Sequence, residues 1–181
     1  MTRDEAWQLV QEKVKNKNLQ KHMLATEAVM RKLAVRFHED EEQWGLAGLL
    51  HDLDYDKTVN DFKNHGLLTA EWLKDTDVPQ PVIQAIQSHP GHFPRESLMD
   101  KALYATDPVT GLIVAAVLMH PAKKLNAMDA TFIERRFHEK RFAAGANRDQ
   151  IQSCSELGLY LNTFIQESLE AMQDIHDVLG F

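Results

Sequence analysis

The sequence predicts an all-α protein, and three observations support this class. Apolar residues recur at helical spacing through most of the chain, several of these segments begin with an N-capping residue, and no segment alternates polar and apolar residues as a half-buried strand does. Glycine and proline separate the helical segments, without internal repeats or a Gly/Ser linker. Because 181 residues are enough to bury a hydrophobic core, we expect one domain over residues 1–181.

The N-terminal half predicts a series of helices with recognisable starts. Thr2 and Glu5 have the spacing of a capping box, which opens a helix that runs to about Lys17. Asn18 can cap a second helix that ends near His38 and carries apolar residues three and four positions apart. The segments that follow are expected as a helix at 44–52, a loop at 55–60, and helices at 62–74 and 79–88.

The C-terminal half begins with a loop at residues 89–94, which contains Pro, Gly and Pro. Ser97 can cap a long apolar helix over residues 98–118, and Pro121 ends it. The segment 122–181 has no recognisable chemistry, so we expect it to complete or cap the helical bundle or to form a homodimer surface. Its helices are expected at 129–140, 147–157 and 159–178.

Composition excludes several classes of function. A formal net charge of -7 argues against nucleic acid as the main partner, because binding its backbone requires a basic surface. The single cysteine, Cys154, excludes an internal disulfide framework and is typical of a reducing compartment. The charged N-terminus lacks an apolar signal core, and no run approaches 18 apolar residues. We therefore expect a cytoplasmic protein that does not bind a membrane.

The most informative stretch is Gly48-Leu49-Leu50-His51-Asp52-Leu53-Asp54-Tyr55. An apolar helix rich in small residues ends here on two adjacent ionisable groups, His51 and Asp52. A buried charge is tolerated when it is paired or coordinated. Adjacent side chains on a helix point about 100° apart, so these two can meet at one ion only at the helix end. We therefore expect this pair to form half of a metal site.

Two further candidate ligands, His22 and Asp107, lie in apolar helical segments on either side of the pair. Two imidazoles and two carboxylates from three helices suit a divalent metal such as Mn, Fe, Ni, Co, Mg or Zn. Such a set leaves open positions for water and a phosphate oxygen, as metal-assisted hydrolysis requires. The alternatives are a packed core histidine at position 22, a cationic helix-end histidine at position 51, and an N-cap before Pro108 at position 107.

The order of these residues resembles the HD-domain superfamily of metal-dependent phosphohydrolases, of the HDIG type. An early His22 is followed by the His51-Asp52 pair that closes a helix and by Asp107 inside a later helix, all within residues 18–120. The resemblance implies a single-domain helical bundle whose metal site lies in this part of the chain. It also implies hydrolysis of a phosphate ester or anhydride, with a nucleotide or another small phosphate compound as substrate.

Members of this superfamily that bind two metals place further histidines between the pair and the late aspartate. His65 and His89 resemble these histidines, and with them six ligands would hold two ions bridged by Asp52. Without the resemblance, His65 also fits the first turn of a surface helix, and His89 fits a helix end before Pro90. The two-metal members include phosphohydrolases and some di-iron oxygenases, so a di-iron oxygenase is an alternative function.

Roles for individual side chains follow from this chemistry. We expect Asp52, between metal and water, to orient the nucleophile or to accept its proton. Lys57, Arg95 and Lys101 are candidate contacts for phosphate oxygens, and the alternative for each is a solvated surface charge. A second alternative function is a module that binds metal and ligand without turnover.

Overall fold

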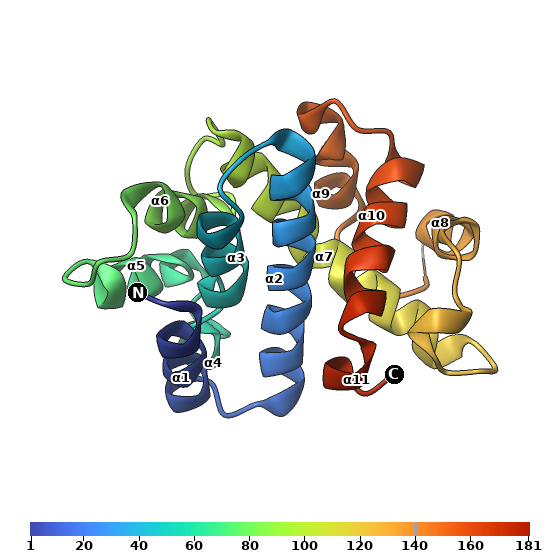
Figure 1. Ribbon diagram of the computed structural model, residues 1–181, viewed down its shortest axis with the longest axis horizontal. Coiled ribbons are helices and arrows are strands. Elements are labelled where there is room, and N and C mark those ends of the chain that lie inside the picture. Colours follow the sequence, from blue (N-terminus) through green and yellow to red (C-terminus); the bar gives the residue numbers. More distant parts are fainter. Residues whose placement is uncertain (140) are drawn as a thin grey trace.

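The computed structural model describes residues 1–139 and 141–181, and no strand occurs in these segments. The all-α prediction is confirmed. Helix α2 (Lys17–Phe37) lies between α3 (Glu41–Leu50) and α10 (Leu161–Asp174), and α7 (Leu98–Met119) crosses behind it (Figure 1). The other α-helices are α1 (Arg3–Lys13), α4 (Tyr55–Thr58), α5 (Leu67–Leu73), α6 (Gln80–Ser88), α8 (Ala130–His138), α9 (Arg148–Gln152) and α11 (His176–Leu179). Short 3₁₀ helices cover Phe62–Asn64, Leu125–Ala127 and Ser153–Leu157.

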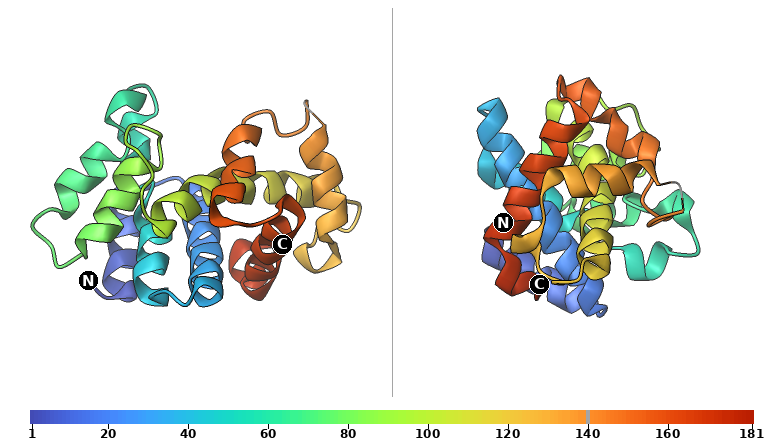
Figure 2. Two further views of the ribbon diagram at one scale, coloured as in Figure 1. Left: turned by 90° about the horizontal axis from the view of Figure 1, so that it is seen from above. Right: turned by 90° about the vertical axis from the view of Figure 1, so that its right-hand side faces the viewer.

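The molecule is elongated, with α5 and α6 at one end and α8 at the other (Figure 2). Buried side chains from both the first 120 residues and the last 60 join one hydrophobic cluster, which includes Leu33, Leu49, Leu112 and Phe164. The C-terminal helices therefore pack on the same core as the helices that carry the candidate ligands.

Helix α7 is the core helix. Its N-terminus is held by a capping box in which Ser97 and Asp100 accept each other's backbone N–H groups. An 18-residue window of this helix has a mean hydropathy of 1.6, so length and composition alone would allow it to cross a membrane, and 56% of that window is buried in the fold. Because α7 packs on α2, α6 and α9, its apolar composition is weak evidence for a membrane segment. The helix continues through Pro108, so Asp107 is an interior residue and not an N-cap.

The junction of the first two helices differs from the prediction. Helix α1 ends at Lys13 because Val14 adopts an extended backbone and its carbonyl accepts a 2.7 Å hydrogen bond from the Gln20 side chain. The N-cap of α2 is Asn16, whose Oδ1 accepts the N–H groups of residues 18 and 19 at 2.9 and 3.4 Å. A tertiary contact therefore moves this boundary by a few residues.

The segment between the His-Asp pair and α6 also differs from the prediction. The expected loop at 55–60 contains the single-turn helix α4, and the expected helix at 62–74 is interrupted at Gly66. Gly66 has a φ of +75°, and a Cβ atom there would lie 2.6 Å from the carbonyl oxygen of Ile86. Only glycine satisfies both the left-handed conformation and this close approach. The interruption places His65 outside the helix, where its ring is free to turn inward.

The C-terminal helices are shorter than expected. Helix α8 begins after its N-cap Asp129 and ends at His138, and the expected end at Lys140 lies outside the described residues. The expected helix at 147–157 is α9 followed by a 3₁₀ helix, and the one at 159–178 is broken at Ile175 into α10 and α11. Cys154 is buried and unbonded to any other cysteine.

Candidate metal centre

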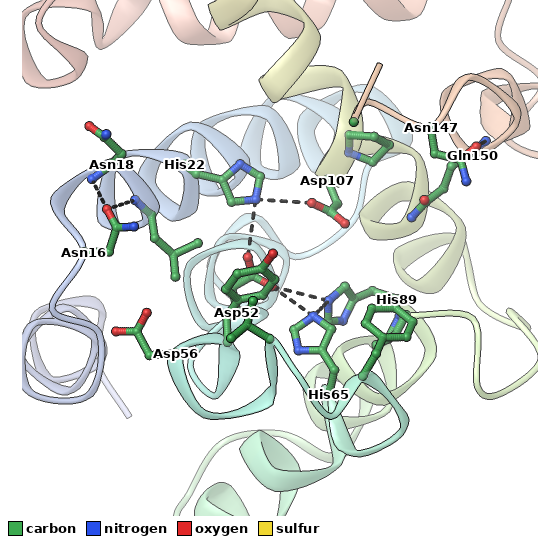
Figure 3. Close-up of a pocket in the computed structure, with 17 residues that line it drawn as sticks. Asn16, Asn18, His22, Asp52, Asp56, His65, His89, Asp107, Asn147 and Gln150 are labelled. Atoms are coloured by element: carbon green, nitrogen blue, oxygen red, sulfur yellow. Dashed lines mark hydrogen bonds and ion pairs between the residues drawn. The ribbon is translucent and has the colours of Figure 1, made fainter. Parts of the chain in front are cut away.

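Five helices bring the six candidate ligands together, and five of the six line one cavity of about 680 Å³ (Figure 3), whereas His51 is fully buried. Four lie on or at the end of long helices: His22 on α2, His51 and His89 at the ends of α3 and α6, and Asp107 on α7. The other two are Asp52, directly after α3, and His65, directly before α5. Figure 3 shows the imidazoles of His22, His65 and His89 pointing toward the carboxylates of Asp52 and Asp107.

The first pair of imidazoles meets because α2 and α3 pack backbone to backbone. A Cβ atom at Gly48 would lie 2.8 Å from backbone atoms of Thr26 and Glu27, so a larger residue has no room there. This close approach leaves the Nε2 atoms of His22 and His51 only 3.2 Å apart.

Asp107 completes a three-ligand group with these two histidines. Its Oδ1 lies 3.2 Å from Nε2 of His22 and 3.8 Å from Nε2 of His51. Two ligands of the same ion, each about 2.0–2.2 Å from it, lie about 3.0–3.4 Å apart. The two spacings of 3.2 Å that involve His22 lie in this range, and the third, 3.8 Å, exceeds it by a few tenths of an ångström, so the three side chains are placed to share one divalent ion after a small adjustment.

A second group lies on the other side of Asp52. Oδ1 of this carboxylate is 3.2 Å from Nε2 of His65 and 3.7 Å from Nε2 of His89, and the two ring nitrogens are 3.1 Å apart. Oδ2 of Asp52 faces the first group, at 3.6 Å from Nε2 of His22. Asp52 therefore lies between the two groups, where it is placed to contact an ion in each.

The outer nitrogens of two imidazoles are held by backbone carbonyls. Nδ1–H of His51 donates to the carbonyl of Gly48 at 2.8 Å, and Nδ1–H of His89 donates to the carbonyl of Ile86 at 2.6 Å. A carbonyl accepts only, so the proton of each neutral ring sits on Nδ1 and the lone pair on Nε2.

The other two imidazoles are oriented by side chains. Oδ1 of Asp54 lies 2.7 Å from Nδ1 of His65, and this carboxylate also accepts the Thr69 N–H. Oγ1 of Thr110 lies 2.9 Å from Nδ1 of His22, and its hydroxyl donates to the carbonyl of Asp107, so it accepts from the histidine. In their neutral forms all four rings therefore carry the lone pair on Nε2, and these atoms face carboxylates and one another, an arrangement that fits a cation between them.

The charges of the cluster are set by contacts among its members, which outweigh the effect of burial. Burial raises the pKa of Asp52, but the surrounding imidazoles, His51 first, outweigh it and hold that pKa well below its usual value. Burial likewise opposes the ionised form of Asp107, and hydrogen bonds from His22 and His51 lower its pKa. Burial lowers the pKa of His65, but Asp52 and Asp54 raise it to about 9. Without metal, both carboxylates are ionised at neutral pH and His65 is protonated.

We expect metal binding to the group that contains His65 to release a proton and to strengthen as the pH rises. The ion must replace the proton on a ring whose pKa is about 9 in the metal-free protein, so protons compete with it below that pH. Affinity should rise by up to about tenfold per pH unit between pH 6 and 8. Calorimetry in two buffers of different ionisation enthalpy measures the released protons, and a pH-independent affinity would contradict this expectation.

We expect Thr110→Val to weaken metal binding by about 10- to 100-fold, because Nδ1 of His22 loses the acceptor that orients the ring. Thr106→Val is the matched control. Thr106 lies one turn earlier on α7, and its buried Oγ1 has no hydrogen-bond partner in the described structure, so this change should be neutral or stabilising. Competition with a chromophoric chelator gives both affinities, and equal values for the two variants would contradict the role of Thr110.

The three cationic residues predicted to contact phosphate lie outside the cavity. Nζ of Lys57 lies over the ring of Trp72 at 5.4 Å, because α4 turns this side chain away from the ligands. Arg95 forms a 2.8 Å ion pair with Glu156, and Lys101 lies in the first turns of α7. No lysine or arginine lines the cavity in the part of the chain that the structure describes.

Several residues that the sequence did not single out contribute to the site. Asp54 orients His65, and Thr110 orients His22. Their positions are a weak sequence signal for this role, because Asp54 lies two residues after the His-Asp pair and Thr110 lies one turn after Asp107. Carboxamides and apolar side chains form most of the remaining cavity wall. They are Asn16, Asn18, Asn147 and Gln150, and Leu19, Tyr55, Val59, Phe62, Pro90 and Pro108.

Comparison with known proteins agrees with this geometry. Residues 19–131 match the HD domain family, and the match spans more than half of the chain and all six candidate ligands. No curated protein and no solved structure matches the chain. HD domains bind divalent metals, and the histidine and aspartate cluster described above fits that property. The chain therefore belongs to the HD domain family, whose members are generally metal-dependent hydrolases.

Proposed function

We propose that this HD domain is a metal-dependent phosphohydrolase that acts on a nucleotide or another small phosphate ester or anhydride. The observation that carries the proposal is the convergence of four imidazole Nε2 atoms on Asp52 and Asp107 at the wall of an open cavity. A cavity of about 680 Å³ accommodates a compound of nucleotide size.

The ligands divide into two sets that share Asp52. His22, His51 and Asp107 would hold one ion, and His65 and His89, whose Nε2 atoms lie 3.1 Å apart beside Asp52, would hold a second. A divalent cation bound here supplies positive charge to phosphate oxygens and lowers the pKa of a coordinated water.

The chain's own contribution to the reaction is orientation. Asp52 keeps its negative charge at neutral pH because the imidazoles lower its pKa. A carboxylate with a lowered pKa is a weak base, so Asp52 acts mainly by accepting a hydrogen bond from water and aligning it with phosphorus. The bonds to Asp54, Thr110 and the two carbonyls hold the imidazoles in place throughout.

Metal analysis and a phosphate-release assay test the proposal together. Protein purified without added metal should contain one or two ions per chain, and two would require His65 and His89. Phosphate release is then measured from monoesters, diesters and anhydrides with Mn, Co, Ni, Mg or Fe supplied. If none of these ions supports the hydrolysis of any substrate, the phosphohydrolase proposal fails.

The assembly of all six ligands also favours a second candidate, a di-iron oxygenase, because that chemistry requires both ions. Oxygen consumption with candidate substrates and an iron signal on reduction would identify it. Tight nucleotide binding without any product would instead indicate a module that binds without turnover.

A further inference from the structure

We propose that the substrate is a phosphate monoester of a neutral, hydroxyl-bearing compound that contains a flat ring, and that Asn147 and Gln150 bind its uncharged part. The inference rests on the phosphohydrolase function proposed above and specifies its substrate class. It also assigns a role to residues that lie beyond the segment matched to the HD family.

The charge of the cavity wall limits the charge of the substrate. Among the described residues that line the cavity, Asp56 is the single charged side chain outside the ligand cluster, and it is acidic. No lysine or arginine stands among the described residues of this wall, so the ligand cluster is the one part of it that can hold a phosphoryl group. A phosphate monoester carries its charge of about -1.5 to -2 on a single phosphoryl group, which can lie at the ligand cluster while the rest of the molecule stays neutral.

Additional phosphates would find no partner in this cavity. A diphosphate or triphosphate brings further negative charge close to Asp56, and no guanidinium or ammonium group lies in the described wall to neutralise it. A charge that leaves water without a partner carries a large desolvation cost. The wall therefore favours one terminal phosphate over a chain of them.

Carboxamides line the cavity on two sides of the ligand cluster. Figure 3 shows Asn16 and Asn18 on one side and Asn147 and Gln150 on the other, with the ligands between them. The side chains of Asn18 and Gln150 make no hydrogen bond to the described residues, so their donors and acceptors are free for a ligand. A carboxamide both donates and accepts, which suits hydroxyl, ring-nitrogen and carbonyl groups without requiring a charge.

An apolar wall lies beside these amides. Tyr55, Val59 and Phe62 line the cavity although 38%, 54% and 57% of their respective surfaces are exposed. Exposed aromatic rings in a cavity wall provide a surface on which a flat ring can stack. The neutral part of the substrate therefore combines hydrogen-bonding groups with a flat apolar face.

The segment 142–150, which forms part of the cavity wall, is crosslinked by hydrogen bonds from the Arg148 side chain. The guanidinium of Arg148 donates to the carbonyl oxygens of Phe137 at 3.0 Å, Ala143 at 2.8 Å and Ala146 at 2.6 Å. These bonds fix the loop between α8 and α9, whose Gly145 lies against the same hollow as His22 and Asp107. Asn147 and Gln150, which follow this loop, line the cavity together with the ligand cluster.

The first test compares the hydrolysis of two compounds that share one nucleoside and differ in the number of phosphates. With saturating Mn²⁺, kcat/KM for adenosine 5′-monophosphate should exceed that for adenosine triphosphate by about tenfold or more. Asp56→Asn removes the negative charge but keeps an oxygen that can accept the Lys15 N–H. It should reduce the preference for the monophosphate over the triphosphate. A preference for the triphosphate would overturn the inference and leave the phosphohydrolase function intact, whereas no hydrolysis of any compound would overturn that function.

The second test uses variants whose folding is protected. Gln150→Ala removes a carboxamide but no capping group, and Asn147→Ser retains an oxygen that can cap α9. Calorimetric binding of adenosine, the neutral parent alcohol of the monoester, needs no turnover. Each variant should weaken this binding by roughly three- to tenfold, while inorganic phosphate binding stays unchanged.

Gln152→Ala is the control, because this residue is exposed on the same helix and does not line the cavity. It should bind the alcohol as the unaltered protein does. Equal binding of adenosine by the variants at positions 150 and 152 would contradict the assignment, as would the absence of any adenosine binding to the unaltered protein.

Discussion

Asp52→Asn should leave the protein folded but reduce its metal-dependent hydrolysis by about 10³-fold or more, which corresponds to roughly 4 kcal/mol of transition-state stabilisation. Asparagine keeps the shape of the side chain but removes the charge. In the structure, both oxygens of Asp52 face imidazole nitrogens, Oδ1 toward His65 at 3.2 Å and Oδ2 toward His22 at 3.6 Å. Because this carboxylate lies between the two groups of ligands, its loss should prevent metal binding at both groups.

The measurements are metal content, phosphate release and circular dichroism on the same preparation. Asp61→Asn is the matched control, because it makes the same chemical change at an exposed carboxylate that does not line the cavity. It should retain metal and activity. If Asp52→Asn retained both its metal and its activity, the two-group arrangement around this residue would not describe the functional site.

Gly48→Ala should destabilise the metal-free protein by about 2 kcal/mol, within the range of about 1–3 kcal/mol for overpacked cores. The added Cβ would lie 2.8 Å from backbone atoms of Thr26 and Glu27, which cannot rotate away as a side chain can. Helices α2 and α3 must therefore separate. The better helix propensity of alanine offsets only about 1 kcal/mol of this effect. Since the carbonyl of Gly48 also holds His51, the variant should bind metal more weakly as well.

Gly111→Ala is the internal comparison, because it makes the same substitution in a helix where a Cβ atom meets nothing within 4 Å. It should be stabilising by about 0.5–1 kcal/mol. Urea unfolding with a chelator present compares the two free energies of unfolding without a contribution from bound metal. If both variants unfolded at the same urea concentration, the close approach of α2 and α3 would not limit stability.

Local patterns were sufficient wherever the determining contacts lie within a few residues. The capping boxes at Thr2 and Ser97 are formed by side chains three positions apart, and both helices begin where these pairs predict. The family could be predicted from the sequence for a related reason. The order of His22, the His51-Asp52 pair and Asp107 in apolar segments is a pattern along the chain and does not depend on their partners.

Predictions differed from the structure where a distant residue decides the outcome. The end of α1 depends on the Gln20 side chain, and the break at Gly66 depends on the backbone of α6. Lys57 was expected near phosphate, but α4 and the ring of Trp72 turn it outward. None of these partners is adjacent in sequence, so no local pattern signals them.

The chain order alone established the helical class, the HD family and the residue types from which a metal centre can be built, because helical periodicity and ligand order are properties of neighbouring residues. The fold alone decided how those residues meet. It placed Asp52 between two groups of imidazoles, tied each Nδ1 to an acceptor, and brought Asn147 and Gln150 to the cavity from a segment with no visible chemistry. The reason is physical: a helix specifies which of its faces is apolar, but the neighbour that covers this face is set by packing across the whole core.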